Sequence, residues 1–247
     1  MNQLFQVGVI DCVFKRRLNR FVGEALVNGK LERIHITNTG RLEEYLVDGR
    51  NCLVIPINGR KLKYRLVAVE DTGGYSVIDT RTQSRAFEAA VERSLICGIK
   101  GCRILGKEPR VGNSKFDYLL ECGSGEVIVE TKSAVLRGPH GEAMYPDCPS
   151  DRGFRHINHL IELHRAGRRV AIIFSAALPG ARCFKPYYEG DPRIYDALGN
   201  AYRERVPILA YSIRMTRDGR VLLENPCLPL CSDWIDSLTS SLTLNSP

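Results

Sequence analysis

The spacing of apolar residues changes near residue 80, and this change limits the possible folds more than any other feature of the sequence. Up to that point, short alternating or β-branched runs are separated by Asn-Gly, Asp-Gly and similar turn signals. The runs that we expect to form strands are residues 4–14, 20–27, 31–37, 51–57 and 63–70. About five short strands without a long helical pattern indicate a small barrel of the OB type.

Beyond residue 80, helical and strand patterns alternate. Helical spacing predicts a helix over 81–97, and a hairpin follows with strands over 115–122 and 127–133. Ser150 is a suitable N-cap for a helix, and the almost continuous apolar run 169–177 is typical of a buried parallel strand. A strand, a crossover helix and a second strand in this order imply a right-handed parallel unit.

The last quarter of the chain continues this α/β pattern. We expect a helix over 191–205, a strand over 207–215, and a tail after residue 226. The sequence therefore predicts two domains, an OB-like β-barrel over 1–80 and an α/β domain with a mixed sheet over 81–247.

Composition narrows the class of protein without identifying a partner. Apolar residues make up 44% and charged residues 26%, which excludes a disordered, collagen-like or coiled-coil chain. The net charge of +7 favours an anionic partner only weakly. The longest apolar stretch, 170–178, is too short to cross a bilayer, and the N-terminal basic cluster follows the apolar residues, unlike a signal peptide. We expect a cytoplasmic location and no membrane partner.

The nine cysteines are an odd number without a C-x-x-C pair. This argues against zinc ribbons and redox motifs, and a disulfide framework is a weak interpretation for a non-secreted chain of this size. We expect the cysteines to be small buried hydrophobes. Cys227 and Cys231 are close enough in sequence to approach one another.

The hairpin contains the most informative group of polar residues. With its turn centred on Ser124-Gly125, Asp117 lies opposite Lys132, and Glu130 lies diagonally from Asp117 at about 7–8 Å. Alternation along the strands places one set of polar residues on a single face: Asp117, Glu121, Glu130 and Lys132. The other face carries core residues: Phe116, Tyr118, Leu120, Val127 and Val129. A slip of one residue in the pairing would put Asp117 on the opposite face from Glu130 and Lys132.

This grouping suits hydrolysis of a phosphodiester. Mg²⁺ (or Mn²⁺) held by Asp117 and Glu130 would polarise a phosphoryl oxygen, and Lys132 would orient water or offset charge in the transition state. Glu88, on the preceding helix, is a candidate for a further carboxylate. The alternative is an exposed ladder of ion pairs that contributes little to stability.

Basic residues form three further candidate groups. On the helix from Ser150, Arg152, His156 and His159 share one stripe, which is either a solvated polar face or, if the helix packs beside the hairpin, a phosphate contact. A paired-histidine metal site is less favoured, because no third ligand is near in sequence. In the barrel, the basic clusters are a solvated rim or a phosphate-contacting patch. They are Lys15, Arg16, Arg17 and Arg20, and then Arg60, Lys61, Lys63 and Arg65.

Several segments in order resemble the sugar fermentation stimulation protein A (SfsA) family. They are RRLNRFVGE (16–24), HITNTGRL (35–42), RKLKY (60–64), SKFDYLLE (114–121), VIVETKSAVL (127–136), YPD (145–147), DRGFRHINHL (151–160) and the FKP segment at 184–186. The set spans almost the whole chain and is specific, although no single member is.

The resemblance implies an OB-like barrel joined to a PD-(D/E)XK nuclease-like domain, DNA binding, and a regulatory role in sugar metabolism. It implies that the nuclease motif falls on Asp117, Glu130 and Lys132, with Glu88 as the helical acid, and it points to Arg152 and His156. Two segments depart from the family pattern: HITNTG (35–40) stands where His-Cys-Pro-Asn-Thr-Gly is usual, and PSDRG (149–153) stands where Val-Thr-Glu-Arg-Gly is usual.

Three functions follow as alternatives. The first is a DNA-binding protein with a divalent-metal-dependent deoxyribonuclease site, and the second is a DNA-binding regulator that uses the nuclease fold as a platform. The third, binding of a small sugar ligand, is not expected, because no sugar pocket is recognisable and Trp234 is the only tryptophan. A homodimer is compatible with the sequence.

Overall fold

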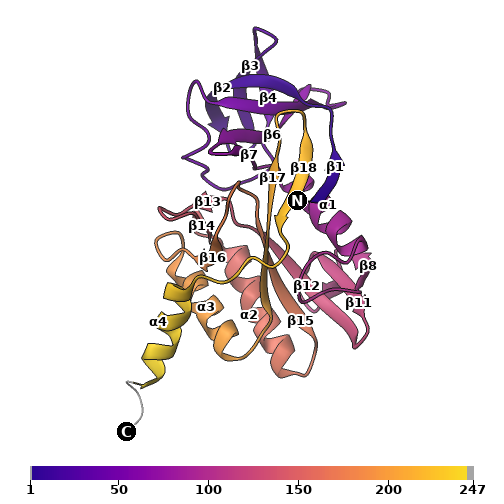
Figure 1. Cartoon of the computed structure of the whole chain (residues 1–247), viewed down its shortest axis with the longest axis vertical. Coiled ribbons are helices and arrows are strands. Elements are labelled where there is room, and N and C mark those ends of the chain that lie inside the picture. The colour runs from indigo at the N-terminus through magenta and orange to yellow at the C-terminus, as the bar shows by residue number, and fades with distance from the viewer. Residues whose placement is uncertain (1, 244–247) are drawn as a thin grey trace. The chain divides into compact units, whose positions relative to one another are not determined.

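The computed structural model describes residues 2–243, which form two compact units (Figure 1). Among the described residues, the first unit contains residues 2–90, 177–180 and 212–225, and the second contains residues 91–176, 181–211 and 226–243. The first unit therefore includes two short segments from late in the chain.

The first unit contains a closed five-stranded barrel. Its strands are β2 (Ile10–Asn19), β3 (Val22–Val27), β4 (Lys30–His35), β5 (Asn51–Pro56) and β6 (Tyr64–Asp71). They pair in the order β4-β3-β2-β5-β6, and a parallel β4–β6 pairing closes the barrel. This is the OB strand order, which confirms the predicted barrel. Fully buried side chains from the strands, among them Phe14, Ile34 and Leu66, fill its interior.

Several elements of this unit were not predicted or have different limits. The expected strand over 4–14 is two strands, β1 (Asn2–Gln6) and β2, and β1 pairs with β18 (Arg220–Asn225). A further strand, β7 (Gly74–Val77), precedes α1 (Thr80–Glu92). The helix ends before residue 97, because Ser94 adopts a left-handed φ of 53° that a helix cannot continue through.

The second unit is a mixed sheet covered by helices. Its strands run in the order β15-β12-β11-β8, and the elements are β8 (Arg103–Lys107), β11 (Tyr118–Cys122), β12 (Gly125–Ser133), α2 (Asp151–Arg165) and β15 (Val170–Ala176). β12 and β15 are parallel and joined through α2, as predicted. Figure 1 shows α2 beside α3 (Pro192–Arg203), and β17 (Ile208–Met215) follows α3. The fully buried β15 explains its continuous apolar sequence.

Smaller strands complete this unit. A hairpin consists of β9 (Arg110–Val111) and β10 (Ser114–Lys115), and a second sheet has the order β13-β14-β16. The strands of this second sheet are β13 (Leu136–Arg137), β14 (Glu142–Tyr145) and β16 (Cys183–Pro186).

The prediction that the chain ends in a tail after residue 226 is wrong, because a further helix, α4 (Ser232–Thr243), forms there. Trp234 and Leu238 bury one side of this helix, and Asp233 forms an ion pair with Lys185. The helix is therefore an integral part of the second unit. No helix among residues 2–243 is long and apolar enough to cross a membrane.

The expectation that the cysteines are simple buried hydrophobes is also wrong. Four disulfides are present: Cys12–Cys52, Cys97–Cys227, Cys102–Cys122 and Cys183–Cys231. Cys227 and Cys231 thus pair with distant residues and not with each other. Partners separated by up to 130 residues are brought together only by the fold, so spacing in the sequence did not reveal them.

Candidate functional site

The β11–β12 hairpin places the two predicted acids directly opposite one another. Its turn is Gly123-Ser124, since Cys122 already pairs with Gly125. The observed register is therefore shifted by two residues from the expected one. Extended by one residue beyond the pair of Tyr118 and Val129, it places Asp117 level with Glu130 and not with Lys132. The Asp117 amide donates to the Val129 carbonyl (3.2 Å). A shift of two preserves the alternation of faces, so the acids still share a face with Lys132.

Glu130 is the centre of the site. Its side chain is 2% exposed, and its Oε1 accepts hydrogen bonds from Lys132 Nζ and from His156 Nδ1 (2.7 Å). Its Oε2 is buried and has no hydrogen-bond partner among the described residues. Burial acts to raise the pKa of this carboxyl, but the charge of Lys132 and the contacts with His156 outweigh it, and the pKa is lowered. Glu130 is therefore an ionised carboxylate whose Oε2 accepts no hydrogen bond from the described residues.

Asp117 is held in place by the backbone next to Glu130. Its Oδ2 accepts from the Thr131 amide (2.8 Å) and from the Thr131 hydroxyl (2.7 Å). Burial and the nearby negative charge of Glu130 nevertheless raise the pKa of the Asp117 carboxyl. Two close carboxylates, one with a raised pKa, are an arrangement that a bound cation would stabilise.

Lys132 and Tyr145 form the basic side of the site. The Lys132 side chain is 11% exposed; burial acts to lower its pKa, but Glu130 outweighs this effect and the pKa is raised. The Lys132 side chain is therefore protonated although it is largely shielded from solvent. Tyr145 was missed as a site residue, although it lies in the YPD segment that carries part of the family resemblance. Its phenol is close to this group, and burial raises its pKa.

Helix α2 places His156 beside the β11–β12 hairpin. Ser150 caps the helix as predicted, since its hydroxyl accepts from the Gly153 amide (3.0 Å). His156 is buried and packs on the Phe116 ring. The predicted stripe of basic residues on this helix is therefore not exposed to solvent at His156. His159 instead contacts the Ser114 hydroxyl (2.7 Å), and Arg152 is exposed on the first turn.

Glu88, the predicted fourth carboxylate, lies half-buried on α1 in the first unit. Its participation in the site stays a prediction.

The arrangement fits a divalent cation that takes only part of its coordination from the protein. Glu130 Oε2 is an orphaned buried oxygen, and Asp117 offers a second carboxylate beside it. Within residues 2–243, no three His, Cys, Asp or Glu side chains are grouped as a complete metal site. Mg²⁺ is commonly bound in this way, through one or two carboxylates together with water and substrate phosphates.

The predicted basic patch of the barrel divides into two kinds of residue. Lys15 pairs with Asp48, and Arg16 pairs with Glu24. Arg17 donates to the carbonyls of the 38–41 loop and of the β2–β3 turn, so its role is to fix these loops. Arg65 pairs with Asp79, and the remaining cations are exposed and have no side-chain partner among the described residues. They are Arg20, Arg60, Lys61 and Lys63.

These exposed cations lie at one end of the barrel. Val22 pairs with His35, and His35 pairs with Arg65, so the β2–β3 turn and the start of β6 are separated by only one strand. Neighbouring strands are about 4.8 Å apart, which places the two loops about 10 Å from each other. Phe21, in the β2–β3 turn, is 51% exposed beside them.

The fold and the site define an OB-domain protein with a nuclease-like domain of the PD-(D/E)XK class, as predicted. Family models agree: the SfsA N-terminal OB domain matches residues 16–78, and the sugar fermentation stimulation protein RE domain matches residues 81–219. The chain belongs to the sugar fermentation stimulation protein (SfsA) family.

Relatives match nearly the whole chain. A sugar fermentation stimulation protein homolog of Pyrococcus furiosus is 50% identical over 215 residues, which cover 87% of this chain and 93% of the relative. A homolog of Archaeoglobus fulgidus is 40% identical over 92% of this chain and 98% of its own. The solved structure of Pyrococcus furiosus SfsA in complex with Ca²⁺ has 46% identity and a TM-score of 0.90, and covers 94% of this chain and 100% of its own.

Proposed function

We propose that this protein binds DNA and hydrolyses its phosphodiester bonds with a divalent cation, Mg²⁺ or Mn²⁺, at Asp117, Glu130 and Lys132. The observation that carries the proposal is the buried Oε2 of Glu130, which lacks a hydrogen-bond partner among the described residues and lies opposite a second carboxylate. An unsatisfied buried oxygen of this kind is costly unless a ligand completes it. The complex of the Pyrococcus furiosus relative with Ca²⁺ supports a divalent cation in this family.

Each side chain has a distinct task in this reaction. A cation held by the two carboxylates supplies positive charge at a phosphate oxygen. Lys132, kept protonated by Glu130, donates hydrogen bonds to the phosphoryl oxygens, where negative charge grows in the transition state. His156 holds Oε1 of Glu130 and so would leave Oε2 as the oxygen available to a cation. Thr131 orients Asp117 in the same way.

The barrel supplies the proposed DNA contact. Arg20 lies in the β2–β3 turn, and Arg60, Lys61 and Lys63 lie in or beside the β5–β6 loop. These are the two loops with which OB folds bind oligonucleotides. Phe21 adds an exposed ring on which a base can stack, which favours a single strand.

A cleavage assay on the full chain tests the catalytic part. Supercoiled plasmid and a labelled single-stranded oligonucleotide are incubated with Mg²⁺ or Mn²⁺, using the wild type, Glu130→Gln and, as a matched control, the exposed Glu126→Gln on the same strand. We expect cleavage by the wild type and the control and none by Glu130→Gln. Equal products from all three, or none from any, would argue against catalysis.

The second candidate is a DNA-binding regulator without turnover, to which the family's link with sugar metabolism would belong. The observation that favours it is that no group of three His, Cys, Asp or Glu side chains among the described residues could hold a metal ion without further ligands. It predicts DNA binding that is unaffected by Glu130→Gln, and no products in the assay.

A further inference from the structure

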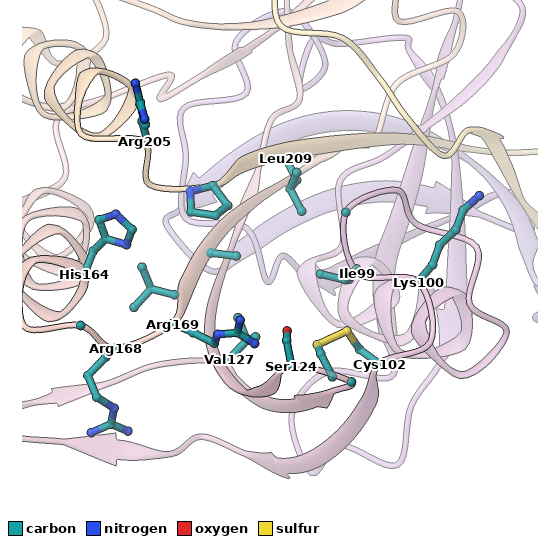
Figure 2. Close-up of a pocket in the computed structure, with 17 residues that line it drawn as sticks. Ile99, Lys100, Cys102, Ser124, Val127, His164, Arg168, Arg169, Arg205 and Leu209 are labelled. Atoms are coloured by element: carbon teal, nitrogen blue, oxygen red, sulfur yellow. A yellow bond between two sulfur atoms is a disulfide. The ribbon is translucent and has the colours of Figure 1, made fainter.

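A cleft lies in the nuclease-like unit, at the opposite end of β12 from Lys132. It has a volume of about 660 Å³ and lies between the hairpin turn, the end of α2 and the loop before β17 (Figure 2). Val127 lines it, whereas Glu130 lies three residues further along the strand, about 10 Å away at 3.3 Å per residue. The cleft is therefore separate from the candidate active site.

The polar lining of the cleft is cationic. Its charged and titratable side chains are Lys100, His164, Arg168, Arg169 and Arg205, and no Asp or Glu lines it. Figure 2 shows Arg169 at the centre, with Arg168, Arg205 and His164 on one side and Lys100 on the other. The Lys and Arg side chains have no ion-pair partner among the described residues, in contrast to neighbouring Arg165, which pairs with Glu204. Glu204 is also the acid near His164.

The floor of the cleft is apolar and closely packed. It consists of Ile99, Val127, Val170 and Leu209, together with the Cys102–Cys122 disulfide. A Cβ at Gly98 would come within 2.8 Å of Leu209, so the loop that carries Ile99 and Lys100 packs closely on this floor. Gly98 also has a φ of +83°, which favours glycine.

An apolar floor beneath unpaired cations is suited to an amphipathic anion. The volume lies within the range of about 300–1,000 Å³ typical of small-molecule sites. Arginines bind phosphate through paired N–H donors, and three of them, Arg168, Arg169 and Arg205, line this cleft. A phosphate alone would leave the floor uncovered, and an apolar ligand alone would leave the arginines unpaired.

We propose that this cleft binds a nucleoside phosphate, with its phosphate groups at Arg168, Arg169 and Arg205 and its base and sugar on the apolar floor. The same chemistry is found in a free nucleotide and in the terminal nucleotide of a DNA strand. The proposal does not depend on catalysis at Glu130, so the two can fail separately.

Calorimetric titration of the full chain in EDTA tests the proposal, because without divalent cations the Asp117–Glu130 site is not engaged. The probes are ATP, dAMP, adenosine, inorganic phosphate and a short 5′-phosphorylated oligonucleotide. We expect ATP or dAMP to bind at least tenfold more tightly than adenosine or phosphate alone. Binding of the oligonucleotide but not of the free nucleotides would assign the ligand to a strand end only if Arg168→Ala/Arg169→Ala weakens that binding and Lys61→Ala/Lys63→Ala does not. Oligonucleotide binding that depends on the barrel lysines alone, or binding of none of the probes, would overturn the proposal.

Two variants locate the binding. Arg168→Ala/Arg169→Ala should weaken it at least tenfold, whereas Arg155→Ala/Arg182→Ala removes the same charge from exposed positions outside the cleft and should not. Ser124→Trp, at the exposed turn, should obstruct the cleft without removing charge. Equal affinity of the two double variants, or full affinity of Ser124→Trp, would contradict a site in this cleft. Glu130→Gln should bind like the wild type.

Discussion

At the scale of single residues, Asp117 and Glu130 show how neighbouring carboxylates acquire opposite properties. Both are withdrawn from water, but Lys132 and His156 contact only Glu130, whose pKa is lowered. Asp117 receives two hydrogen bonds from Thr131, yet burial and the charge of Glu130 raise its pKa. Ionisation of Asp117 is therefore unfavourable for the folded, metal-free protein.

Replacement of Asp117 by asparagine should stabilise the metal-free protein at neutral pH. Because the folded pKa of Asp117 is above its unfolded value, its contribution to stability is greatest below the unfolded pKa and is lost as the pH rises through the folded pKa. The amide oxygen of the asparagine would accept the same Thr131 hydrogen bonds without the charge. Thermal unfolding in EDTA should give a higher Tm for Asp117→Asn, and Mg²⁺ or Mn²⁺ should raise the Tm of the wild type only. A lower Tm in EDTA would contradict this account.

His156 should act as a positioning residue whose Nδ1 is the important atom. Asparagine places an amide N–H close to the position of Nδ1, whereas glutamine places it further out. We therefore expect His156→Asn to retain most of the metal affinity, and His156→Gln and His156→Ala to lose about 10- to 100-fold. Titration with Mn²⁺ measures this directly. Equal losses for the asparagine and glutamine variants would indicate that the ring acts only through its packing on Phe116.

At the scale of elements, the sequence predicted correctly those features that depend only on neighbouring residues, such as strand alternation and helix caps. Strand alternation placed Asp117, Glu130 and Lys132 on one face, because that result survives any even shift of register. The Ser150 cap and the buried β15 were predicted for the same reason. The exact register of the β11–β12 pair, by contrast, depends on which two residues form the turn, and these are Gly123 and Ser124. Helix α4 was missed because its place depends on contacts with segments distant in the sequence, including Lys185 and Cys183.

A partly buried ion-pair network links β14, β16 and α4. Lys185 Nζ donates to Glu142 Oε1 (2.9 Å) and to Asp233 Oδ2 (2.7 Å), and the His140 amide donates to Glu142 Oε2 (2.8 Å). A Cβ at Gly138 would come within 2.5 Å of the Glu142 carboxylate, so the β13–β14 turn closes over it. Burial acts to raise the pKa of Glu142, but these contacts outweigh it and lower the pKa to about 2.

The network should make the protein sensitive to acid over a defined range. Because the folded pKa is lowered, the stabilisation is complete above the ordinary Glu value of 4.5 and is lost as the pH falls toward about 2. After screening by solvent we expect a loss of about 1–2 kcal/mol. Glu142→Gln should lower the free energy of unfolding at pH 7 by a similar amount and flatten its pH dependence between pH 4.5 and 2. Urea unfolding at several pH values measures this, with the exposed Glu162→Gln as control. Parallel pH curves for wild type and Glu142→Gln would refute it.

At the scale of the whole molecule, the two units divide the proposed function. The barrel carries exposed cations on two loops, and the nuclease-like unit carries buried acids around one lysine. Clusters of basic residues in the sequence identified the loops that carry the exposed cations but not the role of each residue. Arg17 belongs to such a cluster and is used by the fold itself, because its guanidinium satisfies loop carbonyls. Exposure and partners, which a linear sequence does not contain, separate the two roles.

The salt dependence of DNA binding distinguishes the barrel surface from the overall net charge. Each phosphate contact on a single strand contributes about −0.7 to the slope of log K against log salt. Lys61→Ala/Lys63→Ala should therefore reduce the slope by about 1.4, with weaker binding to all sequences. The control Lys30→Ala/Arg182→Ala removes the same charge from two exposed positions outside the β2–β3 turn and the β5–β6 loop. Fluorescence anisotropy with a labelled oligonucleotide at several salt concentrations gives both slopes. If the two variants change the slope equally, DNA responds to the charge of the whole protein, and these loops are not its binding surface.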